Sequence, residues 1–143
     1  MIPQWIGQHH NNITIDLVFL DGGNNPGEQI KEFHLLDPYL PTGGQVLAHD
    51  AKMRKGKWLV PYLSLLDNWK LQVCDVSEYG LLHATKIGCQ PSPASRRAAS
   101  NALLKMRCHP VEIAAAVLPG KVCGFALGLL PQRFARRLSD GCK

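Results

Sequence analysis

The sequence lacks the cysteine patterns that bind zinc or that form the disulfide bonds of secreted proteins. It has five cysteines in 143 residues, an odd number, and no Cys-x-x-Cys pair. This spacing gives no zinc signature and no disulfide framework, so a reducing compartment is the default expectation. The first residues, MIPQWI, also lack the basic segment and apolar run of a secretory signal. We therefore expect a cytoplasmic protein.

Long hydrophobic runs are absent as well. The longest, Val122–Leu130, is interrupted by glycines and closed by Pro131. A membrane-spanning helix needs about 20 apolar residues, so this run is too short and no transmembrane segment is expected. The hydrophobic content of 45% is nevertheless enough for the core of about one domain.

Acidic residues become scarce near the end of the chain. Residues 1–91 carry 7 Lys or Arg and 9 Asp or Glu, whereas residues 92–143 carry 9 and 2. The change follows a segment rich in proline, Gly88–Ala94, which is typical of a boundary. We predict an α/β part, residues 1–88, and a basic helical extension, residues 89–143. Helices are expected at Ser95–Arg107, with Ser95 as its N-cap, at Pro110–Leu118 and at Lys121–Leu138.

The basic extension has two possible meanings. Basic blocks can mark contact with nucleic acid or an anionic membrane, but a solvated helix face produces the same pattern. Only two aromatic residues, Phe125 and Phe134, accompany the arginines, and no nucleic-acid-binding motif is present. The extension is thus interpreted as a solvated helix or a partner-binding arm, and nucleic acid is not an expected partner.

The N-terminal part has the pattern of a strand, a helix and a second strand. Ile13–Leu20 contains the near-continuous apolar run LVFL, which is typical of a strand covered on both faces in a parallel sheet. Helical spacing follows in Pro26–Leu40, and Gln45–His49 reads as the next strand. The three form a βαβ unit with a right-handed crossover. The helix is expected to bury Ile30, Phe33, Leu36 and Leu40.

The pattern then adds a helix and a hairpin. Ala51–Lys57 is predicted to be a basic loop and Trp58–Leu66 a helix with Pro61 in its first turn. Asn68–Val76 and Gly80–Ile87 are rich in β-forming residues and closely connected, so they should pair antiparallel at one edge of a mixed sheet. The residues expected to pack inward are Trp58, Leu59, Tyr62, Leu65, Leu66 and Cys74.

Each of the first two strands ends in an acidic residue, Asp21 and Asp50. In an open α/β sheet, chemistry collects beyond the carboxyl ends of the strands. The two carboxylates therefore mark the place where a functional site is predicted. The alternative is that Asp21 caps the following turn and Asp50 is a solvated residue at a strand end.

The motifs IDLVFLDG and YLPTGGQVLAHD, each followed by a helix, and the final hairpin resemble a known family. It is the class I S-adenosylmethionine-dependent methyltransferases, and within it the small-molecule O-methyltransferases, whose C-terminal half matches Ile2–Ile87. The resemblance implies a partial Rossmann-like sheet of two parallel strands and an antiparallel hairpin. It implies methyl transfer from S-adenosylmethionine to an oxygen of a small molecule, with Asp21 and Gly22 contacting the cofactor.

The resemblance also implies a metal site. If the two parallel strands are neighbours, about 4.8 Å apart, Asp21 and Asp50 would repel each other unless a cation such as Mg²⁺ bound between them. In metal-dependent members of the family the matching residues hold such a metal. Two family residues differ here: the third ligand, an Asn, is Ala51, and a Lys that acts as base is Asn24. His49 is the nearest substitute base, although strand alternation would point it away from Asp50.

The family's glycine-rich cofactor loop has no counterpart in this sequence. We therefore expect a fragment or truncated relative that is inactive by itself and exposes a bare parallel edge suited to self-association. Two functions stay open: a methyltransferase with Asp21, Asp50 and His49 as its catalytic residues, or a non-catalytic remnant that acts as an interaction module through its basic extension.

Overall fold

The computed structural model describes residues 13–23 and 25–109. Its elements, in chain order, are β1 (Leu17–Leu20), α2 (Pro26–Leu36), the 3₁₀ helix η1 (Asp37–Tyr39), β2 (Gln45–His49), α3 (Gly56–Ser64), β3 (Trp69–Cys74), β4 (Leu81–Lys86) and α4 (Pro93–Arg107). The fold class is α/β, as predicted. The predicted helix at Ile2–Gly7 and those at Pro110–Leu118 and Lys121–Leu138 lie outside the described residues.

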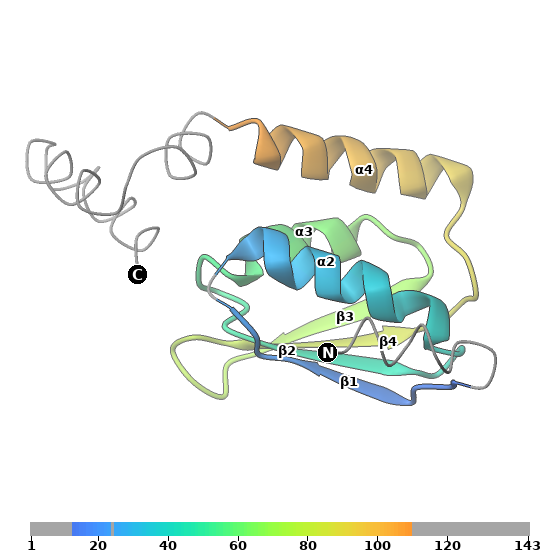
Figure 1. Cartoon of the computed structure of the whole chain (residues 1–143), viewed down its shortest axis with the longest axis horizontal. Helices are drawn as coiled ribbons and strands as arrows, with labels where there is room; N and C mark the ends of the chain where they lie inside the picture. The colour runs from blue at the N-terminus through green and yellow to red at the C-terminus, as the bar shows by residue number, and fades with distance from the viewer. Residues whose placement is uncertain (1–12, 24, 110–143) are drawn as a thin grey trace, which may run out of the picture. The chain divides into compact units, whose positions relative to one another are not determined.

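The four strands form one open, mixed sheet in the order β1-β2-β4-β3 (Figure 1). β1 and β2 are parallel neighbours, with Leu20 beside Ala48. β4 pairs antiparallel with both β2 and β3, so the predicted hairpin is confirmed. The parallel pair thus brings the carboxyl ends of β1 and β2 to the same edge of the sheet.

Local sequence explains where α2 begins and ends. Asn25 is its N-cap and accepts a hydrogen bond of 2.8 Å from the amide of Gly27, and Pro26 occupies the first turn, where its missing N–H costs nothing. The helix was predicted to reach Leu40 but ends at Leu36. Pro38 cannot donate the next helical hydrogen bond, so the chain continues as η1.

α3 begins two residues earlier than predicted, at Gly56, and Pro61 therefore lies inside the helix instead of in its first turn. The predicted inward face is accordingly wrong in part. Leu65 is 40% exposed, whereas Leu63, which the pattern did not select, is fully buried. The other predicted residues, Trp58, Leu59, Tyr62 and Leu66, are buried.

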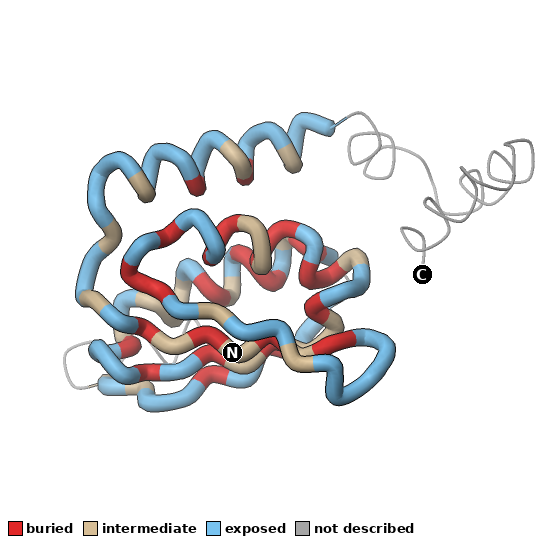
Figure 2. Tube along the Cα trace, turned by 180° about the vertical axis from the view of Figure 1, so that it is seen from behind, coloured by how far each residue is buried: buried red, intermediate tan, exposed pale blue. Residues whose placement is uncertain are grey.

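The helices α2 and α3 cover one face of the sheet (Figure 1), and the buried residues of the strands alternate accordingly (Figure 2). In β1, Val18 and Leu20 are buried, whereas Leu17 and Phe19 are 54% and 58% exposed. The expectation that β1 is covered on both faces is therefore wrong for the described residues. Cys74, predicted to be a core residue, is only half-buried because it ends the edge strand β3.

The chain divides into two compact units, residues 1–99 and 100–143. α4 begins at Pro93, and Ser92 rather than the predicted Ser95 lies before its first turn, where the Ser92 hydroxyl accepts a bond of 3.3 Å from the amide of Ser95. The Ser95 hydroxyl instead accepts a bond of 3.0 Å from the amide of Asp67. The predicted boundary at residues 88–89 stays a prediction.

Candidate functional site

Three acidic or histidine side chains meet at the carboxyl ends of the parallel strands. Asp21 follows β1, His49 ends β2, and Asp50 is the next residue. One ligand atom from each lies within 4.8 Å of the others. The expectation that Asp21 and Asp50 lie close together is thus confirmed, and it follows from the parallel pairing of β1 with β2.

The prediction that His49 points away from Asp50 is wrong. Nδ1 of His49 lies 2.9 Å from Oδ1 of Asp50 and 3.5 Å from Oδ1 of Asp21. The reason is the backbone of Asp50, whose φ of 60° is left-handed, a conformation that Asp adopts more readily than most residues. Strand alternation stops at this bend, so two consecutive side chains face the same site.

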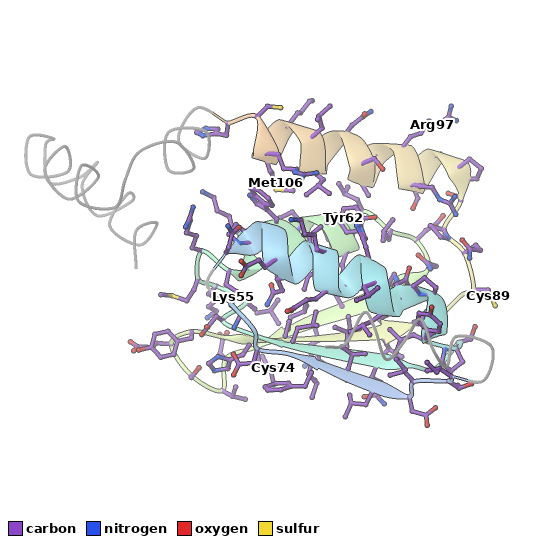
Figure 3. All side chains as sticks on the ribbon, viewed as in Figure 1. Lys55, Tyr62, Cys74, Cys89, Arg97 and Met106 are labelled. Atoms are coloured by element: carbon purple, nitrogen blue, oxygen red, sulfur yellow. The ribbon has the colours of Figure 1, made fainter. Side chains whose placement is uncertain are left out.

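Lys55 is a site residue that the sequence analysis missed. Its side chain is only 5% exposed, and Nζ lies 2.8 Å from Oδ1 of Asp21 and 3.7 Å from Oδ2 of Asp50. Figure 3 shows it at the end of the sheet from which the chain leaves β1 toward α2. The pattern treated Lys55 as one of four equivalent basic loop residues, Lys52, Arg54, Lys55 and Lys57, and nothing in the sequence separates it from the others.

The position of Lys55 depends on the glycine that follows it. Lys55 directly precedes α3, and the amide of Gly56 donates a hydrogen bond of 3.3 Å to the carbonyl of Asp50. A Cβ on Gly56 would lie 2.4 Å from the carbonyl oxygen of Ala51 and 2.5 Å from its Cα. Only glycine allows this approach, which places the start of α3 against the end of β2 and brings Lys55 to the carboxylates.

The loop between β3 and β4 borders the same site. The amides of Ala51 and Lys52 donate to the carbonyls of Gly80 and Tyr79, at 3.1 and 2.9 Å. The ring of Tyr79 lies 6.4 Å from that of His49. Tyr79 also escaped the sequence analysis, because only the backbone pairing of the hairpin with the turn after β2 brings it here.

Lys55 dominates the electrostatics of Asp21. Its hydrogen bond and its charge, with a smaller contribution from His49, hold the pKa of the Asp21 carboxyl below the usual 3.8, although desolvation acts in the opposite direction. Asp21 is therefore ionised throughout the neutral range. Because its side chain is 51% exposed, a solvent molecule or substrate can also reach it.

The residues predicted to bind the cofactor or a metal differ in how well their surroundings suit that role. Gly22 lies against α2, since a Cβ there would be 2.7 Å from Oε1 of Glu32. Ala51 offers no side-chain ligand, and Asn24 lies outside the described residues. Asp21, His49 and Asp50 are the right donors for a metal. However, the Lys55 ammonium already contacts the two carboxylates that would bind it, so the residues present do not fit a divalent cation while Lys55 stays in place.

Comparison with known proteins adds no assignment, because no family model and no curated protein matches the chain. Among residues 13–23 and 25–109, the structure contains no helix of the length and hydrophobicity that a membrane span requires.

Proposed function

We propose that the chain is the acceptor-binding part of an S-adenosylmethionine-dependent methyltransferase that acts on a hydroxyl group of a small molecule. The observation that carries the proposal is the contact between Asp50 and His49, 2.9 Å, at the carboxyl ends of two parallel strands. A carboxylate that orients an imidazole is an arrangement used for general-base chemistry. The order and directions of the described strands are compatible with the resemblance found in the motifs.

The pair defines which nitrogen of His49 acts as the base. A carboxylate only accepts hydrogen bonds, so Asp50 favours the tautomer with the proton on Nδ1. Nε2 is then the nitrogen that removes the proton from the acceptor hydroxyl. The side chain of His49 is 37% exposed, so a substrate can reach it.

Asp21 and Lys55 have supporting roles in this scheme. Lys55 lowers the pKa of the Asp21 carboxyl further and holds the carboxylate in place through a hydrogen bond. The Asp21 carboxylate is then available to accept hydrogen bonds from the methyl donor or the acceptor. S-adenosylmethionine, when bound, supplies the electrophilic methyl group. Its glycine-rich loop in the family has no counterpart among the described residues, so Asp21 and Gly22 would contact only one margin of the cofactor.

Calorimetric titration of the full chain with S-adenosylhomocysteine tests donor binding. If this chain holds the donor, binding should be saturable, lost in Asp21→Ala and kept in Asp75→Ala, a matched control in which an exposed carboxylate paired with Lys52 is removed. Absence of binding by the unaltered chain would exclude methyl transfer by this chain alone.

If the titration shows donor binding, His49 is tested by transfer of a labelled methyl group to a panel of phenols and aliphatic alcohols. Loss of a general base lowers the rate by about 10²–10⁴-fold, so His49→Gln should reduce turnover in this range without changing donor affinity. Equal turnover in the two proteins would show that His49 is not the base.

One observation favours the second candidate, a non-catalytic interaction module. Helix α4 carries four basic residues and no acidic one, and Arg96, Arg97, Lys105 and Arg107 are all exposed. Such a helix suits an acidic partner surface. A chain that binds an acidic protein partner, loses this binding in the Arg96→Ala/Arg97→Ala variant and shows no affinity for S-adenosylhomocysteine would support this candidate over the first.

A further inference from the structure

The ammonium of Lys55 already bridges the two carboxylates of the candidate metal site. Nζ contacts Oδ1 of Asp21 at 2.8 Å and Oδ2 of Asp50 at 3.7 Å, and these two carboxylates are the metal ligands that the resemblance implies. A divalent cation such as Mg²⁺ would need oxygen ligands at about 2.1 Å. To take these two oxygens as ligands, it would have to displace the ammonium.

Displacing Lys55 is unfavourable for reasons visible in the structure. The residue is only 4% exposed, and it directly precedes α3. Gly56, next to it, is fixed by its close approach to the backbone of Ala51. Moreover, if the ammonium stayed nearby, it would repel the incoming cation at short range and in a partly desolvated site.

We infer that Lys55 is a built-in cation that replaces the divalent metal and makes the site metal-independent. Its single positive charge lies against both carboxylates and offsets their mutual repulsion. Because an ammonium is not a Lewis acid, it does not activate a hydroxyl as a metal does, and proton removal is left to His49. The converse also holds: the side chains of Asp21, His49 and Asp50 form a latent metal site that loss of Lys55 would uncover. The inference concerns cation binding and stands whether or not the chain transfers methyl groups.

Titration of the full chain with Mn²⁺, followed by electron paramagnetic resonance, is the test. The unaltered protein should show no saturable binding below millimolar Mn²⁺. Lys55→Met should bind one Mn²⁺ at least about tenfold more tightly, because a repelling charge about 4 Å away has been removed. Lys52→Met removes the same charge from the same loop, where Lys52 pairs with Asp75, and should behave like the unaltered protein. Adding Asp21→Asn and Asp50→Asn to Lys55→Met should abolish the new binding.

The unaltered chain alone can overturn the inference. If Mn²⁺ broadens the nuclear magnetic resonance signals of His49 and Asp50 before those of exposed acidic residues such as Asp75, a metal binds there despite Lys55. Equal Mn²⁺ affinities of the unaltered protein and a folded Lys55→Met would also refute it. Should Lys55→Met fail to fold, Lys55→Gln provides the same comparison with a polar side chain, and the broadening measurement decides independently of both variants.

Discussion

Two buried lysines lie at opposite ends of the sheet and have different surroundings. Lys86, 4% exposed, donates to the carbonyl of Asp37 at 2.8 Å, pairs with the carboxylate of Asp37 at 2.8 Å and lies 5.8 Å from the ring centre of Trp69. Lys55, equally buried, faces two carboxylates that remain in contact with solvent and that His49 also contacts.

Lys86 belongs to a structural ion pair, whereas Lys55 belongs to a site whose negative charge is only partly compensated. One ammonium meets one carboxylate at Lys86, and the carbonyl and the ring complete its surroundings. At Lys55 one ammonium meets two carboxylates, so negative charge is left over, and the exposed fractions of Asp21 and Asp50 are 51% and 23%. Burial of a lysine by itself therefore says little about function. The number and exposure of its partners distinguish the two ends.

The largest effect is expected for Gly56→Ala, which disturbs only the Lys55 end. The added Cβ would lie within 2.7 Å of three backbone atoms of Ala51, none of which can move like a flexible side chain. We expect a loss of about 3 kcal/mol in the free energy of unfolding, typical of severe overpacking. Urea denaturation measures it. Gly88→Ala is the control, because its Cβ would meet Asn68 at an ordinary 3.5 Å. Similar losses of unfolding free energy in both variants would mean that the close approach at Gly56 is not the cause.

An intermediate effect is expected when each lysine is replaced by methionine. Lys86→Met should destabilise by about 2 kcal/mol, since it leaves the partly buried Asp37 without its partner. Lys55→Met should destabilise less than Lys86→Met, because solvent can stabilise the exposed Asp21 carboxylate. Urea denaturation of the two variants side by side gives the comparison directly. A larger loss in Lys55→Met than in Lys86→Met would reverse our interpretation of the two ends.

The smallest effect concerns the titration of Asp21. Its pKa in the folded protein lies below the unfolded value of 3.8, so the ionised carboxylate stabilises the fold above pH 4. This stabilisation is lost as the pH falls through the folded pKa. Carbon-detected magnetic resonance of the Asp21 carboxyl should show the depressed pKa, and Lys55→Met should raise it. Lys52→Met should leave it unchanged. A carboxyl that titrates alike in all three proteins would remove Lys55 as the cause.

Much of the fold follows from local patterns. The limits of β2, the pairing of β1 with β2, the hairpin and the burial of Ile30 and Phe33 in α2 are set by alternation, helical spacing and turn residues, which act over a few neighbours. Leu36, also predicted to face inward, is only half-buried. Those signals also place Asp21 and Asp50 at the carboxyl ends of neighbouring parallel strands. The predicted limits of the helices are wrong where a single residue overrides the pattern. Pro38 ends α2 early, and the close approach of Gly56 starts α3 early.

The rest of the site depends on contacts between distant segments. Nothing local distinguishes Lys55 from Lys52, yet one is buried between two aspartates and the other forms an exposed pair with Asp75. His49 was assigned the wrong direction because a left-handed residue cannot be recognised from an Asp alone. Lys86 likewise gave no sign of its burial beside Trp69. Sequence patterns locate charged residues on elements, but tertiary packing decides which of them meet.

The edge position of β1 has a consequence for how the site can come apart. Within residues 13–23 and 25–109, this short strand is hydrogen-bonded to β2 on one side only, whereas β2 and β4 are each flanked by two strands. Its amide protons should therefore exchange with solvent through local opening events of lower free energy than global unfolding. Each such opening would carry Asp21 away from Lys55 while His49 and Asp50 stay on the central strand. The fraction of molecules in which Asp21, His49, Asp50 and Lys55 are in contact is thus set by the local stability of β1 and not by that of the whole sheet.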